Sequence, residues 1–130
     1  MAKYAYPAVF TPDGDLYTVH FPDFECCYTQ GNGIVDAMEM AQDVLCLTLY
    51  DMEEKGIAVP DPSDVRGVTA CDGGFVSLVT CDTVEYRKFY DSKAVKKTLT
   101  IPSWLNTMAE RQGVNFSQIL QDALREKVGA

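Results

Sequence analysis

The sequence lacks the marks of several common protein classes. None of its apolar runs approaches the roughly 18 residues that a membrane-spanning helix requires. Its first residues, MAKYAYPAVF, have neither the long apolar stretch nor the cleavage site of a secretory signal. Internal repeats and low-complexity tracts are missing as well. We therefore expect a cytosolic, globular protein.

Motifs for metal binding and catalysis are equally scarce. His20 is the only histidine, and the five cysteines include no C-x-x-C pair, so neither a zinc site of ordinary spacing nor a cofactor is expected. No nucleophile motif or Gly-rich phosphate loop is present. The odd number of cysteines argues against a disulfide framework. We interpret the adjacent Cys26 and Cys27 as small, semi-buried residues in a reducing compartment, with a redox-sensing pair as the alternative.

Charge is distributed unevenly along the 130 residues, which allow one ordinary domain and a small second one. Residues 1–92 hold 5 basic and 16 acidic side chains, a net charge of −11, whereas residues 93–130 hold 6 basic and 3 acidic, a net charge of +3. A basic tail is suited to phosphates and an acidic body to a positively charged partner. Alternatively, the acidic side chains only keep the body in solution.

Residues 1–81 predict a β-β-β-α-β domain. Strand-forming residues alternate in several short runs, and Asp13-Gly14 between the first two is a hairpin signal. The expected strands are 4–10, 16–21, 26–30 and 75–81, and the expected helix runs from Ile34 to Met52 and ends at Gly56. Asp82 and Glu85 indicate the start of a short helix, which with its linker fills residues 82–94.

Residues 95–130 predict a strand followed by two helices. Thr98 and Thr100 alternate with apolar residues in the strand expected at 96–101, and Pro102 begins a helix that Gly113 ends. Asn115 and Gln118 form a capping pair for the second helix. A segment of this size is too small to bury a core alone. Two copies related by a two-fold axis would pair their strands and cover both apolar helix faces.

This order of elements resembles the ribbon-helix-helix DNA-binding domain. The resemblance implies that paired strands enter the major groove, where lysine and threonine side chains can contact base edges. The corresponding positions are Lys96, Thr98 and Thr100. It also implies a phosphate site at the start of the second helix, at Asn115, Phe116 and Ser117. Lys97 departs from the module's pattern, which has an apolar residue there. The alternative is a strand and helical hairpin that only dimerises.

The body is similar to the HicB antitoxin family. The segments that carry the similarity are YPAVF, DGDLYTVHFPDF, CYTQG, DAMEMAQDVL and PDPS, which together span residues 4–64. Glu25-Cys26 stands where the family has Pro-Gly, and Gly33 where it has a Thr or Ser helix cap. The resemblance implies an α+β protein with a trimmed ribonuclease-H-like body (1–81), a linker (82–94) and a ribbon-helix-helix tail (95–130).

For function, the resemblance implies a type II antitoxin. Such a protein binds a small, basic, HicA-like toxin that cleaves messenger RNA, and it represses its own operon by binding an inverted repeat in the operator as a homodimer, with a tetramer left open. The candidate toxin contacts are the loop carboxylates Asp13, Asp15, Asp23 and Glu25. The alternative is a stand-alone repressor whose body oligomerises or senses a ligand.

An enzyme would need carboxylates that converge on metal ions. Glu39 and Asp43 lie one helical turn apart, but no pattern in the sequence brings them together with the carboxylates of the loops. We therefore expect no catalytic activity.

Overall fold

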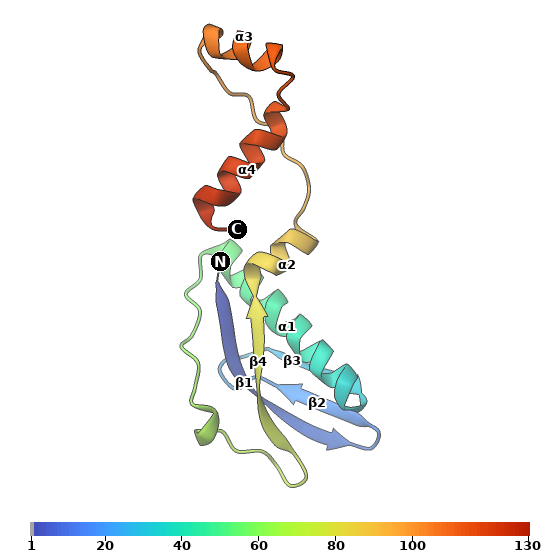
Figure 1. Cartoon of the computed structure of the whole chain (residues 1–130). Coiled ribbons are helices and arrows are strands. Elements are labelled where there is room, and N and C mark those ends of the chain that lie inside the picture. The colour runs from blue at the N-terminus through green and yellow to red at the C-terminus, as the bar shows by residue number, and fades with distance from the viewer. Residues whose placement is uncertain (1) are drawn as a thin grey trace. The chain divides into compact units, whose positions relative to one another are not determined.

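The structure is a computed structural model that describes residues 2–130 as two compact units, one ending at Ser92 and the other comprising Lys93–Ala130 (Figure 1). The first unit contains β1 (Lys3–Asp13), β2 (Leu16–His20), β3 (Tyr28–Asn32), α1 (Gly33–Lys55), a 3-10 turn (Val65–Gly67), β4 (Phe75–Asp82) and α2 (Thr83–Tyr90). The second contains α3 (Ser103–Arg111) and α4 (Phe116–Val128). This confirms the α+β class.

The four strands form one antiparallel sheet in the order β3-β2-β1-β4. β1 pairs with β2 on one side and with β4 on the other, and α1 crosses one face of the sheet (Figure 1). Gly14, with φ +63°, makes the tight turn between β1 and β2, as the Asp-Gly signal predicts. Strand pairing thus joins β4 to β1, although more than 60 residues separate them.

The core lies between this sheet and α1. Alternate residues of β1 face the helix, and Tyr6, Ala8 and Phe10 are at most 1% exposed. The buried residues of α1 recur at helical spacing: Ala37, Ala41, Leu45, Cys46 and Leu49. The alternating residues of the strand and the helically spaced residues of α1 therefore pack together in one layer of side chains, as the sequence predicts.

Gly31 allows α1 to begin directly against β3. A Cβ atom at this position would lie 2.4 Å from the backbone nitrogen of Ala37, closer than any real contact. The expected end of the third strand at Gln30 is wrong, because β3 continues through Gly31 to Asn32. Glycine is required here for close approach and not as a strand breaker.

Two other expectations need correction. The third strand begins at Tyr28, and Cys26 lies in the preceding turn. Residues 96–101 carry no strand, since residues 91–102 contain neither a helix nor a hydrogen-bonded strand. A strand requires a partner to share its backbone hydrogen bonds, and the second unit supplies none within a single chain.

A nearly buried ion pair fastens α2 to the rest of the first unit. The carboxylate of Glu53 on α1 accepts hydrogen bonds from Tyr4 Oη (2.9 Å), Thr83 Oγ1 (3.0 Å) and Arg87 Nη2 (3.1 Å). The side chains of Glu53 and Arg87 are only 10% and 13% exposed. Burial raises the pKa of Tyr4 to about 12, with Glu53 adding to the effect.

The same contacts lower the pKa of Glu53. Burial by itself would raise that pKa, but hydrogen bonds, including those from Tyr4, Arg87 and Thr83, outweigh it. A carboxyl with a lowered folded-state pKa stabilises the fold above its unfolded pKa, and this contribution disappears as the pH falls through the folded value. The contribution is therefore present at neutral pH and lost in acid.

Glu53→Gln tests this ion pair. We expect the free energy of unfolding at pH 7 to fall by about 3 kcal/mol, because the nearly buried Arg87 loses one of its counter-charges. The difference from the unchanged chain should shrink as the pH drops below the ordinary carboxyl value of 4.5. Urea denaturation across this pH range measures it. Glu39→Gln, at an exposed position of the same helix, is the control, and equal losses in both variants would contradict the assignment.

Candidate functional site

The second unit exposes most of its apolar side chains. None of residues 93–130, all of which are described, is buried. The exposed apolar residues are Val95, Leu99, Ile101, Trp104, Leu105, Met108, Phe116, Ile119, Leu124 and Val128. Trp104, the largest of these side chains, is 64% exposed. Apolar area of this extent normally marks an interaction surface.

A groove opens between the segment before α3 and the helix α4. Its volume is about 810 Å³, and the apolar residues that line it are Val95, Leu99, Leu120 and Leu124. Lys96, Lys97, Ser117 and Gln121 complete its lining. We call this the tail groove. The structure thus brings two of the predicted site residues, Lys96 and Ser117, to one groove.

The other site residues predicted in the second unit lie in two places, the segment before α3 and the start of α4. Thr98 and Thr100 are exposed on the segment before α3, and neither lines the tail groove. Asn115 is the N-cap of α4, and its side-chain oxygen accepts the backbone N–H of Gln118 at 3.1 Å. The capping pair expected from the sequence is therefore present. It leaves the N–H groups of Phe116 and Ser117, like those of any first helical turn, without intrahelical partners.

In the first unit, the predicted loop carboxylates divide between the two ends of β2. Asp13 and Asp15 lie at the β1–β2 turn, while Asp23 and Glu25 follow the other end of the strand. Asp23 is engaged within the fold, since its carboxylate accepts hydrogen bonds from the backbone N–H of Ser63 (3.0 Å) and from the Ser63 hydroxyl. The four carboxylates do not form one patch.

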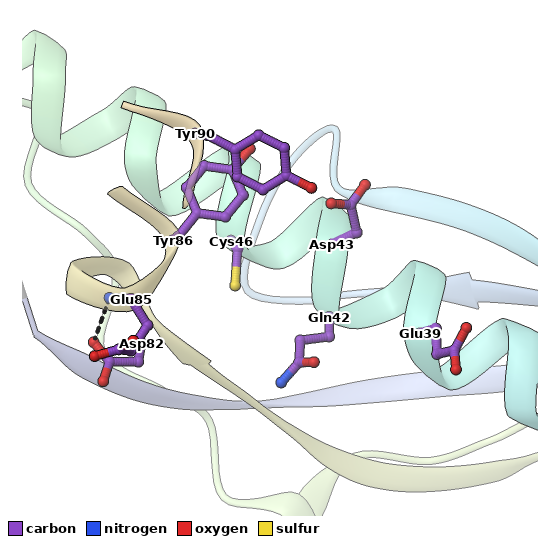
Figure 2. A pocket seen from close by; sticks show the side chains of 8 residues that line it. All are labelled: Glu39, Gln42, Asp43, Cys46, Asp82, Glu85, Tyr86 and Tyr90. Atoms are coloured by element: carbon purple, nitrogen blue, oxygen red, sulfur yellow. Dashed lines mark hydrogen bonds between the residues drawn. The ribbon is translucent and has the colours of Figure 1, made fainter. Parts of the chain in front are cut away.

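An acidic surface that the sequence did not reveal surrounds a pocket between α1, the end of β4 and α2 (Figure 2). Its volume is about 380 Å³. The lining residues are Glu39, Gln42, Asp43, Cys46, Asp82, Glu85, Tyr86 and Tyr90. The Tyr86 and Tyr90 rings contact each other there in a tilted arrangement, with centroids 4.5 Å apart. We call this the acidic pocket, since four carboxylates and no basic side chain line it.

Three elements bring these carboxylates together. Glu39 and Asp43 come from one face of α1, and Glu85 comes from α2. Asp82, at the end of β4, caps α2 by accepting hydrogen bonds from the backbone N–H groups of Val84 (3.0 Å) and Glu85 (3.4 Å), the second of which Figure 2 shows. Burial, followed by the charge of Asp43, raises the pKa of Tyr86. The sequence alone does not predict this convergence of carboxylates, because it depends on how α1 packs on β4.

The described part of the chain shows neither a metal site nor a membrane-spanning helix. Among residues 2–130, no group of three or more His, Cys, Asp or Glu side chains is arranged to hold a metal ion. In the same range, the longest helices are too short or too polar to cross a bilayer.

Comparison with known proteins gives one family. Residues 5–70 match the sequence model described as the HicB-like antitoxin of bacterial toxin-antitoxin systems. A chain in the structure of a toxin-antitoxin complex from Streptococcus pneumoniae is 35% identical, over 96% of this chain and 99% of that one, with a TM-score of 0.63. None of the curated proteins matches the sequence.

Two other solved structures share the fold at lower identity. The Burkholderia pseudomallei antitoxin HicB is 24% identical over 98% of both chains, with a TM-score of 0.53. A chain of the HicA3 and HicB3 toxin-antitoxin complex is 21% identical over 61% of this chain and 99% of that one, with a TM-score of 0.52.

Proposed function

Because the chain belongs to the HicB-like antitoxin family, we propose that its first unit neutralises a HicA-like toxin and that its second unit, as a dimer, binds operator DNA and represses the operon. The observation that carries this proposal is the 35% identity with a chain of a toxin-antitoxin complex over nearly the whole length of both chains. The division of charge between the two units supports it.

The first unit is suited to a basic toxin. Its net charge of −11 attracts a cationic RNA-binding surface over a distance and helps to orient it. The candidate contacts form two separate sets, Asp13 with Asp15 and Asp23 with Glu25. These sets lie at opposite ends of a five-residue strand, roughly 17 Å apart, so a single toxin side chain cannot reach both. Asp23 is the weakest candidate, because Ser63 already occupies its carboxylate.

The second unit is suited to pairing with a second copy. Leu99 and Leu124 line the tail groove and are 58% and 52% exposed, and residues 96–101 have no strand partner. Pairing these segments about a two-fold axis forms a two-stranded ribbon and buries the apolar side chains of both copies. Dimerisation and folding of this unit are then one process.

The paired segments present the residues for DNA. Lys96, Thr98 and Thr100 alternate along the exposed segment and would reach base edges from the ribbon. The first turn of α4 would receive a phosphate at the N–H groups of Phe116 and Ser117. Asn115 contributes by fixing the start of that helix, since its side chain is bound to Gln118.

The experiment that tests the whole proposal is co-expression with the product of the neighbouring gene. A basic partner that co-purifies with the chain and is toxic in its absence supports the antitoxin function. If operator DNA is bound but no such partner exists, the chain is a stand-alone repressor. If neither is bound, the proposal is wrong in both parts.

A chain ending at Ser92 tests the division of labour. We expect it to rescue cells from the toxin as the full chain does, because the first unit contains its own core, and to lose operator binding completely. Colony counts under toxin induction measure the rescue, and circular dichroism checks that the fragment is folded. A folded fragment that fails to rescue would refute the assignment of the toxin site to this unit.

Lys96→Ala and Thr98→Ala test the register on DNA. Each should weaken operator binding by about 1–3 kcal/mol, through loss of a base contact, without affecting rescue. Titration by gel shift measures the affinities at fixed salt concentration. Lys88→Ala in the first unit removes the same charge and is the control. Unchanged gel shifts in both tail variants would reject the proposed register.

Leu124→Asp tests the paired tail. Each copy should lose about 2 kcal/mol of apolar burial, and two added carboxylates should repel across the axis, so that the tail pairs dissociate at micromolar concentration. Analytical ultracentrifugation of the full chain measures its mass. Val35→Asp, at an exposed apolar position of α1, is the control. Equal masses for Leu124→Asp and the unchanged chain would contradict tail pairing.

A further inference from the structure

One long edge of the sheet has no neighbouring strand. β4 is the last strand in the order β3-β2-β1-β4 and pairs only with β1, so none of residues 2–130 continues the sheet beyond it. The pairing is continuous from Phe75, opposite Phe10, to Asp82, opposite Lys3. A free edge of this kind presents backbone N–H and C=O groups to which another strand can bind.

The hydrogen bonds at the start of α2 fix which groups face this edge. The backbone N–H of Thr83 donates to the carbonyl of Ala2 at 3.0 Å, so these two residues form a hydrogen-bonded pair. Such pairs alternate with non-hydrogen-bonded pairs along antiparallel strands, which makes every second residue of β4, beginning at Val76, non-hydrogen-bonded to β1. Pro7 agrees with this phase, because it has no N–H and lies opposite Leu78. The N–H and C=O groups of these β4 residues therefore point toward the free edge.

Side chains of the first unit cover only part of the edge. Gln42 Nε2 on α1 donates to the carbonyl of Thr80 at 3.1 Å, and the Ser77 hydroxyl donates to the carbonyl of Leu78 at 3.3 Å. Within residues 2–130, no side chain accepts a hydrogen bond from the N–H groups of Val76, Leu78 or Thr80. Three outward donors are thus available to a partner.

The edge also lacks the features that usually keep sheets from pairing. Residues 75–81, FVSLVTC, carry no charge and no proline, and the ladder to β1 has no bulge. Leu78, in the middle of the strand, is 49% exposed, and Met38 of α1 lines the same hollow and is 36% exposed. The edge therefore offers both backbone hydrogen bonds and apolar contacts.

Three hollows follow this edge of the first unit. The first, of about 220 Å³, lies beside Met38 and Leu78, and the second, of about 440 Å³, lies beside Lys3. The third is the acidic pocket. Gln42 lines all three, and Figure 2 shows its side chain reaching out from α1, so the hollows join there. We call the three together the β4 groove, which extends from Leu78 to Tyr90.

Charge determines which kind of strand fits the β4 groove. The described residues that line it include one basic side chain, Lys3. Its acidic residues are Glu39, Asp43, Asp82 and Glu85. A second copy of this edge would bring the same carboxylates toward one another, whereas a basic segment would neutralise them. The groove is therefore complementary to a basic partner and not to itself.

We propose that the β4 groove holds the basic protein partner of the first unit, and that the partner binds as an extended segment added to the free edge of β4. Side chains of an added strand alternate between two faces. Those toward α1 would be basic and lie near Glu39 and Asp43, while those on the opposite face would be apolar and lie near Leu78. The inference rests on the proposed function for the existence of a basic partner, and it places the backbone contact apart from the loop carboxylates of β2.

Hydrogen–deuterium exchange of the full chain, read for single amides by NMR, tests the pairing. The probe is the basic product of the neighbouring gene, co-purified with the chain. In the free chain, the N–H groups of Val76, Leu78 and Thr80 should exchange quickly and those of Ser77 and Val79, which face β1, slowly. In the complex, the first three should slow by about a hundredfold. Protection that appears in the concentrated free chain and is lost on dilution would identify a second copy as the occupant and overturn the proposal.

Two variants test the edge and its charge. Leu78→Lys adds the kind of charge that protects natural edges, and Asp43→Lys reverses a carboxylate of the groove. Each should weaken binding of the basic partner by about tenfold or more, measured by calorimetry, and leave operator binding unchanged. Ile57→Lys and Asp61→Lys make the same changes at exposed positions outside the groove, and both should bind like the unchanged chain.

The outcomes separate this inference from the proposed function. If the unchanged chain binds no basic partner, both are wrong. If it binds one, but the edge amides exchange as in the free chain, the partner docks elsewhere and only this inference is overturned. Equal losses in the variants and their controls would mean that net charge alone holds the partner, which also overturns it. Should a variant fail to fold, the exchange measurement on the unchanged chain decides.

Discussion

The constraint on which the rest depends is that the last 38 residues cannot bury their own apolar side chains. Two short helices and one unpaired segment enclose no core, and all of residues 93–130 are exposed or half-buried. Such a unit is stable only if another surface covers it. In the proposed dimer, a second copy of the same unit would supply both the missing strand and the missing apolar face, so the proposed DNA site and the proposed dimer are inseparable.

The first unit, in contrast, buries its apolar side chains within a single chain. Its sheet and α1 share a layer of side chains that includes Tyr6, Phe10 and Leu45, all at most 1% exposed. The short helix α2 is attached by the ion pair of Glu53 and Arg87 and by Tyr86, which packs against the core. The acidic pocket lies where α1, β4 and α2 come together. Attachment of α2 therefore also determines the shape of this pocket.

Charge distinguishes the two units as clearly as packing does. The acidic unit has its own core and is suited to a cationic protein, while the basic unit lacks a core and is suited to a phosphate backbone. Membership of the HicB-like antitoxin family gives this division a biological context. Under the proposed function, a partner that covers the acidic unit would not have to compete with DNA, since different residues are proposed for each.

The sequence by itself determined the features that depend on near neighbours. The alternation in β1, the helical spacing of α1 and the caps at Asp82 and Asn115 were all predictable, because each involves residues within a few positions of one another. Only the tertiary structure decided which distant residues meet: Glu53 with Tyr4 and Arg87, and the carboxylates of α1 with Asp82 and Glu85. It also separated Asp13 and Asp15 from Asp23 and Glu25. The physical reason is that these meetings follow from strand order and from the way α1 lies on the sheet, and no local pattern of residues encodes either.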